Sequence, residues 1–329
     1  MWEMIAGLSR QYRWAADLEA ISVPRATAVV VCGMGGSAIS GDMAAAAVPS
    51  ALIVVSKGYS LPEWAAGIRP LVIAVSYSGN TEETQSAVKE ALALDLPVAV
   101  VTGGGALDEL SEQLNLPVVR VPTGLQPRAA LGYLTGGVLR LLEWAGVVPN
   151  QTSTLAEAAD VVGELWGDGP AGPAGHLAGD LADGLSGRIP VIYGSTGLTA
   201  PVAQRWKTQI NENGKRPAFW SLLPELDHNE IVGWSALESL TRRSLGIVLL
   251  RDRDEHPQVR RRFTLTTNLI SGSVPVVGEV WSQGESRLAR IAGSALIGDL
   301  VSVFLAEHEG IDPVPVEVIE NLKVLLNEE

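Results

Sequence analysis

The chain has 329 residues, of which 47% are hydrophobic and 19% are charged, so it has the composition of a globular protein and the length for two ordinary domains. Its net charge of −13 argues against general nucleic-acid binding, which needs a basic face to meet the phosphate backbone. A single cysteine, Cys32, excludes an intramolecular disulfide and fits a reducing compartment.

The N-terminal stretch carries apolar side chains at helical spacing and charges of both signs, which predicts an amphipathic helix over 1–20. It lacks the basic and then apolar layout of a signal peptide. No segment reaches about 18 uninterrupted apolar residues, the length that a membrane-spanning helix needs. We therefore expect a cytoplasmic protein with no membrane span.

Short apolar runs alternate with helical patterns through the first half of the chain. The runs predict strands at 28–32, 51–55, 71–75, 97–102 and 117–121, with helices after the first and the third. Strands that alternate with helices form right-handed βαβ units and a parallel sheet covered on both faces. Cys32 ends the first run and is expected to be a buried, unreactive thiol.

The region 146–187 combines a helical piece with a passage rich in Gly, Pro and Ala, which indicates a boundary between domains. After it the strand–turn–helix pattern begins again. Strands are predicted at 189–193, 218–222, 246–250 and 274–277, and helices at 199–211, 286–307 and 315–326. We predict an N-terminal domain over 1–148 that includes the first helix, and a C-terminal domain over 149–329 that includes the linker region and the last helices.

The turn after the third strand reads SYSGNTEET and leads into a helix that opens on two glutamates. Ser, Thr and Asn followed by acidic residues mark a helix N-terminus, whose unpaired N–H groups and positive dipole end attract anions. Ser76, Ser78 and Thr81 can surround one point there. The pattern suggests phosphate binding, although many α/β proteins have such turns for structural reasons alone.

The turn after the first strand reads CGMGGSA and contains Gly35, Gly36 and Ser37. Its glycines let the backbone approach a bound group closely, so the turn is either a second part of a phosphate site or a tight structural turn. It is not G-x-G-x-x-G, and no acidic residue in a ribose-binding context follows about 20 residues later. A dinucleotide site is therefore the weaker interpretation.

Two candidate proton-transfer groups lie in the stretch 206–234. Glu212 stands between two asparagines at a helix end, where it is either a general base or a solvated carboxylate. His228, in LDHNE, is either a proton-transfer group or an ordinary loop residue. No set of residues has the spacing of metal ligands.

Five stretches spread over the chain carry a resemblance to a known family. They are GMGGSA, SYSGNTEET, NENGK, LPELDHNEIVGW and EGIDPVPVEVIENLK. In this order, they resemble the bifunctional phosphoglucose/phosphomannose isomerase family. The resemblance implies an α/β fold of two SIS (sugar isomerase) domains of the three-layer αβα type, each with a mainly parallel, doubly wound sheet. It also implies an aldose–ketose isomerisation of glucose 6-phosphate and fructose 6-phosphate, often with mannose 6-phosphate accepted as well.

The resemblance also implies roles for particular residues. Glu212 matches the base that moves a proton between C1 and C2 through a cis-enediol, and Arg128 matches the cation that stabilises the enediolate oxygen. Lys323 matches a lysine near the ring oxygen. His228 matches the residue that helps to open the ring and that reaches in from the partner subunit of a homodimer. The cradle for the substrate phosphate matches Gly35, Gly36, Ser37, Ser76, Ser78 and Thr81.

These roles fit together chemically, because a carboxylate can take a weakly acidic proton only if the enediolate is stabilised electrostatically. The chemistry requires no metal and no organic cofactor, and it implies a hexose 6-phosphate as partner but no nucleic acid. On the residues alone, Arg128 is also explained as a capping or surface arginine, and Lys323 is best explained as a solvated helical lysine.

One departure concerns the C-terminal segment. Relatives that use mannose 6-phosphate commonly carry a threonine there, thought to give room at C2, whereas this chain reads DPVPV over 312–316. The glucose reaction is therefore the safer expectation. Two alternatives stay open: a regulatory SIS protein that binds a sugar phosphate without converting it, and an enzyme acting on an amino-sugar phosphate.

Overall fold

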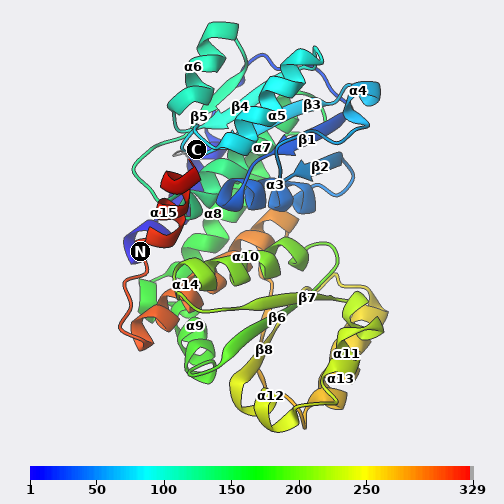
Figure 1. The fold of residues 1–329 in the computed structure, drawn as a ribbon, viewed down its shortest axis with the longest axis vertical. Helices are drawn as coiled ribbons and strands as arrows, with labels where there is room; N and C mark the ends of the chain where they lie inside the picture. The colour runs from blue at the N-terminus through cyan, green and yellow to red at the C-terminus, as the bar shows by residue number, and fades with distance from the viewer. Residues whose placement is uncertain (327–329) are drawn as a thin grey trace.

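The computed structural model describes residues 1–326 and contains two parallel sheets, one above the other in Figure 1. The first has the order β2-β1-β3-β4-β5 and the second the order β7-β6-β8-β9. The first sheet consists of β1 (Ala28–Cys32), β2 (Leu52–Ser56), β3 (Leu71–Ser76), β4 (Val98–Thr102) and β5 (Val118–Arg120). The second consists of β6 (Ile189–Ser195), β7 (Phe219–Leu223), β8 (Leu245–Arg251) and β9 (Val276–Trp281). Every predicted strand is confirmed, although the last one begins two residues later and runs further than predicted.

The central strands are continuous apolar runs because both faces of each sheet are covered. In β1, Val29 and Val31 face one hydrophobic cluster while Val30 and Cys32 face another. All five residues of β1 are buried. Burial raises the pKa of the Cys32 thiol to about 12, which agrees with the expected unreactive cysteine.

Helices cover both faces of each sheet, which confirms two three-layer αβα units. On the outer face of the first sheet lie α4 (Ala65–Ile68), α5 (Glu82–Ala93) and α6 (Gly105–Leu114), and on its inner face α3 (Gly35–Ala47) and α7 (Leu131–Trp144). On the inner face of the second sheet lie α9 (Pro173–Gly184), α10 (Thr199–Glu212) and α14 (Arg287–His308), and on its outer face α11 (Glu230–Gly233) and α13 (Pro257–Ile270). The short helix α12 (Glu238–Ser244) leads into β8. The helices that were not predicted from the sequence are α4, α6, α7, α9, α11, α12 and α13.

The inner helices of both units share one hydrophobic core. A single cluster of buried side chains reaches from β1 and β3, through α7, α10 and α14, to β6 and β8. Helix α14 is long and apolar enough to cross a membrane by length and composition, but 94% of its most hydrophobic window is buried inside the protein. It therefore occupies the place of a core helix.

The single helix predicted over 1–20 is wrong, because two helices are present there, α1 (Trp2–Ala6) and α2 (Leu8–Ala16). They meet at Gly7, which lacks a side chain to stabilise a continuous helix. The two helices also have different partners. Trp2 packs against Phe304 with ring centroids 4.9 Å apart, whereas α2 packs on α7, where a Cβ on Gly132 would lie 2.7 Å from the Gln11 side chain.

The region 146–187 is more regular than its composition indicates. It forms α8 (Thr152–Trp166) and α9, whose apolar sides are part of the shared core. The Gly/Pro passage between them is a tight turn, and a Cβ on Gly172 would lie 2.0 Å from the Trp166 carbonyl oxygen. Glycine is required there by close packing and not by flexibility. The division of the chain into domains 1–148 and 149–329 stays a prediction.

Candidate active site

The proposed phosphate cradle lies at the switch point of the first sheet. The chain leaves β1 towards β2 on one side, while β3 pairs with β1 on the other, so the turns after β1 and β3 open onto the same crevice. Ligands of parallel sheets bind at such crevices, outside the carboxyl ends of the strands. The Tyr77 backbone N–H donates to Ser37 Oγ over 3.3 Å, which joins the two turns.

The hydroxyl groups of the cradle also hold its own backbone. Ser76 Oγ and Thr81 Oγ1 are 2.8 Å apart, and Ser76 Oγ accepts from the Gly79 N–H at 3.1 Å. The Asn80 N–H donates to Ser78 Oγ at 3.2 Å. Ser76 is fully buried and Ser78 is exposed, so the two serines are not equivalent. Thr81 forms no side-chain cap on α5, whose first N–H groups therefore do not pair with that hydroxyl.

The two glycines of the cradle differ in what they contribute. Gly35 has a φ of +51°, a left-handed conformation that glycine adopts without strain, and it opens α3. Gly36 makes room for a neighbouring loop, because a Cβ there would lie 3.1 Å from the Cα of Arg128. Gly36 thus brings the cradle against the backbone of Arg128.

Arg128 connects the cradle to Glu212. It lies in the 3₁₀ turn η1 (Pro127–Ala129), is 3% exposed, and places Nη1 3.6 Å from the Glu212 carboxylate at the end of α10. Burial lowers the pKa of Arg128 below its ordinary value, and the Glu212 charge partly counteracts this shift. Its Nε donates to Asn213 Oδ1 at 2.7 Å, and its Nη2 donates to the carbonyls of Pro313 and Val314, both at 2.8 Å.

Behind this pair lies a buried ion pair that holds the Arg128 backbone. Arg205 Nη2 donates to the Arg128 carbonyl at 2.9 Å and to Asp299 Oδ2 at 2.6 Å, and both charged side chains are almost fully buried. Gln209 also donates to Asp299, at 2.9 Å.

Removing one partner of this ion pair leaves an uncompensated buried charge. We therefore expect Asp299→Ala to lower the free energy of unfolding by about 3–5 kcal/mol, as measured by urea denaturation. Asp160→Ala, which removes the partner of Arg13 in an exposed pair, is the matched control and should cost less than about 1 kcal/mol. Equal losses in the two variants would contradict a structural role for the buried pair.

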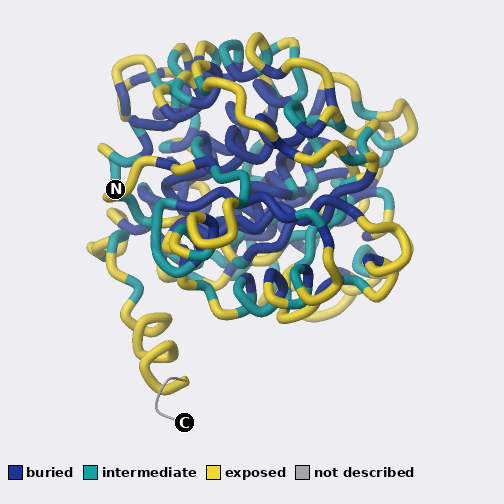
Figure 2. Tube along the Cα trace, turned by 90° about the horizontal axis from the view of Figure 1, so that it is seen from above, coloured by how far each residue is buried: buried dark blue, intermediate teal, exposed yellow. Residues whose placement is uncertain are grey.

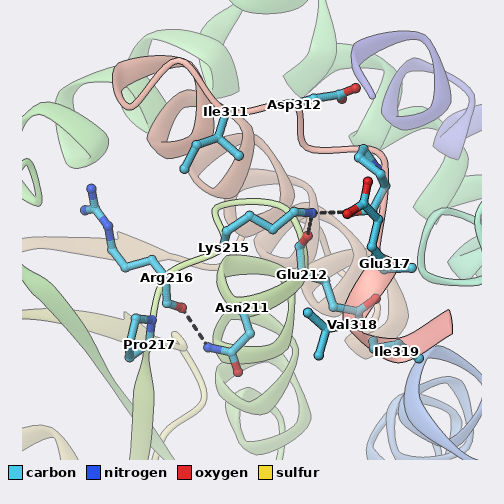
Figure 3. A pocket seen from close by; sticks show the side chains of 12 residues that line it. Asn211, Glu212, Lys215, Arg216, Pro217, Ile311, Asp312, Glu317, Val318 and Ile319 are labelled. Carbon is cyan, nitrogen blue, oxygen red and sulfur yellow. Dashed lines mark hydrogen bonds between the residues drawn. The ribbon is translucent and has the colours of Figure 1, made fainter. Parts of the chain in front are cut away.

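Lys215 ties the C-terminal segment to the same site. Its Nζ donates to the carbonyls of Glu212 and of Pro315, the latter at 2.6 Å. Burial lowers the pKa of Lys215, and the neighbouring Arg128 charge acts in the same direction. Together, Arg128 and Lys215 hold residues 313–315 beside Glu212, as Figure 3 shows for the lysine.

A cavity of about 700 Å³ opens beside Glu212 and Lys215, large enough for a small ligand (Figure 3). It is bounded by the end of α10 and the start of α15 (Glu317–Leu326). Its lining residues are Asn211, Glu212, Lys215, Arg216, Pro217, Ile311, Asp312, Pro315, Val316, Glu317, Val318 and Ile319. No group of three or more metal-ligating side chains occurs within residues 1–326.

The structure does not bring His228 to Glu212 within one chain. Helix α10 runs back along β6, so Glu212 lies at the end of the second sheet where β7 begins. His228 ends the 3₁₀ turn η3 (Glu225–His228), which follows the opposite end of β7. The histidine is exposed, while its neighbours Asp227 and Glu230 are anchored inwards, to Arg262 at 2.8 Å and to Tyr193 at 2.5 Å.

Lys323 also lies away from the cavity. It sits on α15, none of whose described residues is buried, and it is not among the side chains that line the cavity. No role was predicted from the sequence for Lys215 or Asn213, which make the closest contacts around Glu212 and Arg128. Both lie within the NENGK motif, next to Glu212, and that proximity was the available signal.

The two doubly wound units and the hydroxyl-lined switch point place the chain in the sugar isomerase (SIS) class of folds. A family model described as "Bacterial phospho-glucose isomerase C-terminal SIS domain" matches residues 175–326. A hypothetical protein of known structure, TT0462 from Thermus thermophilus, shares the fold with a TM-score of 0.72 and 17% identity, over 98% of this chain and 89% of its own.

Sequence relatives cover nearly the whole chain. The bifunctional phosphoglucose/phosphomannose isomerase of Caldicellulosiruptor bescii is 40% identical over 91% of this chain and 89% of its own length. The enzyme of the same name from Aquifex aeolicus is 36% identical over 98% of this chain and 97% of its own. A more distant relative from Sulfolobus acidocaldarius, 28% identical over 95% of this chain and 93% of its own, is a D-glucosamine-6-phosphate 4-epimerase. The chain belongs to the bifunctional phosphoglucose/phosphomannose isomerase family.

Proposed function

We propose that the protein interconverts glucose 6-phosphate and fructose 6-phosphate, with mannose 6-phosphate as a further substrate to be tested. The observation that carries this proposal is the Arg128–Glu212 pair, which borders both the phosphate cradle and a cavity of about 700 Å³. The names of the two relatives above describe this reaction in proteins that align with nearly the whole chain.

In the proposed mechanism, the cradle holds the C6 phosphate and leaves C1 and C2 at Glu212. The Glu212 carboxylate takes the proton from C2 of the aldose and returns it to C1, through a cis-enediolate, while a hydroxyl proton moves between O1 and O2. Binding the phosphate away from the reacting carbons supplies positioning energy.

Arg128 stabilises the negative oxygen of the enediolate, and its geometry indicates which nitrogen does so. Nε and Nη2 are held by Asn213 and by backbone carbonyls at 2.7–2.8 Å. Nη1 makes only long contacts, 3.4 Å to Gln126 and 3.6 Å to Glu212. We therefore assign Nη1 as the donor to the substrate oxygen. A hydrogen bond from Nη1 to the charged enediolate oxygen is shorter and stronger than its contacts with Gln126 and Glu212.

We further propose that the active unit is a homodimer in which His228 serves the site of the partner subunit and helps to open the sugar ring. The exposure of His228 supports this, as does its place at the end of β7 opposite to Glu212. The residues on both sides of the histidine are also anchored to the protein. A histidine presented in this way is well placed for proton transfer at neutral pH. We also propose that Lys323 lies near the ring oxygen of the bound sugar. This role requires α15 to move closer to the cavity beside Glu212.

The first experiment measures turnover by the purified protein. We expect fructose 6-phosphate to be converted to glucose 6-phosphate in an assay coupled to glucose-6-phosphate dehydrogenase. A separate assay with mannose 6-phosphate decides whether the segment 312–316, which lacks threonine, still accepts the second sugar. If neither sugar is converted while both raise the melting temperature, the protein is a binding module and the isomerase proposal is wrong.

The relative named as a D-glucosamine-6-phosphate 4-epimerase supports a second candidate, an activity on an amino-sugar phosphate. Incubation with glucosamine 6-phosphate, followed by separation of the sugar products, tests it directly. A faster turnover of the amino sugar than of fructose 6-phosphate would favour this candidate over the first.

A further inference from the structure

Helix α15 carries an apolar stripe that is largely exposed, although its first two members, Val318 and Ile319, also line the cavity beside Glu212. Residues 318, 322 and 325 follow each other at helical spacing, as do 319, 322 and 326, so these positions form one face. Val318 is 83% exposed and Leu322 is 56% exposed. The stripe consists of Val318, Ile319, Leu322, Leu325 and Leu326. Figure 2 shows the helix projecting from the rest of the protein, coloured as exposed along its length.

The base of this helix is nevertheless fixed in place. Arg128 and Lys215 hold the carbonyls of residues 313–315, and α15 begins two residues later. The helix thus starts at the rim of the cavity that holds Glu212 and extends outwards from it. A fixed base with an uncovered apolar stripe is the geometry of an arm that packs on another molecule.

The segment that carries His228 has matching properties. Beyond the histidine it exposes three apolar side chains, Val232, Leu237 and Leu240, of which Leu237 is 71% exposed. Leu237 also has a φ of +56°, a left-handed conformation that is strained for a branched side chain. Strain and an exposed apolar side chain at one position point to a partner that covers it.

The acidic start of α15 is complementary in charge to the basic end of α12, which lies next to residues 232–240. Helix α15 has Glu317 and Glu320 in its first turn, whereas α12 has Glu238 in its first turn and ends with Arg242 and Arg243. Opposite charges around an apolar contact favour one docking orientation and oppose unrelated partners. Since both surfaces belong to this chain, a twofold dimer would form the contact twice.

We infer that α15 is a dimerisation arm whose apolar stripe packs on residues 232–240 of a second copy of the chain. This inference rests on the proposed function in one respect, because the contact would bring the partner subunit's His228 towards the cavity beside Glu212. Lys323 follows Leu322 on the helix and borders the stripe, so docking would bring the lysine to the same interface.

Substitution on the two faces of α15 tests the arm. Val318→Asp with Leu322→Asp places charges on the stripe, and Val324→Asp places one on the opposite, equally exposed face. None of these side chains is buried, so each substituted chain should still fold. We expect the double variant to dissociate at least about 100-fold more readily in analytical ultracentrifugation, while Val324→Asp stays a dimer like the unmodified chain.

Cross-linking tests the location of the contact. Cys32 is buried, so the native chain offers little thiol background. When Leu322→Cys and Leu237→Cys chains are mixed and exchanged, a short bismaleimide should link them into covalent dimers, and neither variant alone should be linked at these positions. Linkage that occurs only inside one chain carrying both cysteines overturns the inference.

The remaining outcomes are equally decisive. The inference that α15 is a dimerisation arm is wrong if the unmodified chain is a monomer or if the double variant dimerises normally. It is also wrong if Val324→Asp dissociates as readily as the double variant. If the double variant and the cross-links behave as expected while the unmodified chain converts no sugar phosphate, the dimerisation inference is supported and the proposed isomerase activity is wrong. If the unmodified chain converts fructose 6-phosphate and the double variant remains a dimer, only the dimerisation inference is wrong.

Discussion

Glu212→Gln should lower the turnover of fructose 6-phosphate by about 10²–10⁴-fold, the usual contribution of a general base. The amide keeps the size of the side chain but cannot accept the C2 proton. In the proposed mechanism the substrate phosphate binds at the cradle, where Glu212 makes no contact, so the loss should appear in kcat with little change in the binding of the sugar phosphate. Coupled kinetics together with ligand-induced shifts in melting temperature separate the two effects.

Glu309→Gln is a suitable control for this variant. Glu309 pairs with Arg216 at 2.6 Å but does not line the cavity, so its replacement removes a nearby carboxylate from outside the proposed site. We expect this control to keep nearly full activity. A Glu212→Gln enzyme that stays within a few-fold of the unmodified protein would show that another group takes the proton.

The strands of this fold were predictable because their signal is local. A strand buried on both faces must be apolar at every position, and runs such as AVVVC and LVIAV have no other simple explanation. Helices α6 and α7 gave a weaker signal. Helix α7 contains Gly132, Gly136 and Gly137, which disfavour a helix by propensity but allow close packing against α2 and the sheet. Tertiary packing decided their conformation.

The cradle and the Arg128–Glu212 pair illustrate two levels of predictability. Hydroxyl-rich turns after neighbouring parallel strands indicate an anion site from the residues alone. The contact between Arg128 and Glu212 joins positions 84 apart in sequence, and only the family resemblance linked them before the structure was known. Lys215 was missed because its role depends on the carbonyls of a distant segment, which no local pattern reveals.

Mixing two inactive variants should restore activity if His228 serves the partner subunit's site. In a mixed dimer of Glu212→Gln and His228→Ala chains, one site carries both substitutions and the other carries neither. Random exchange makes half of the dimers mixed, so activity should recover to about 25% of the unmodified level. Co-expression of the two variants, or exchange through reversible unfolding, followed by the coupled assay, measures this recovery.

The same mixture also tests the alternative arrangement, in which each site takes Glu212 and His228 from one chain. If Glu212 and His228 of one chain formed a site together, every site in every dimer would lack one of them, and mixing would restore nothing. The doubly substituted chain mixed with the unmodified chain is the control, because its mixed dimers contain two sites that each carry one substitution. Since the structure places the two residues at opposite ends of β7, recovery by complementation is the result that its geometry favours.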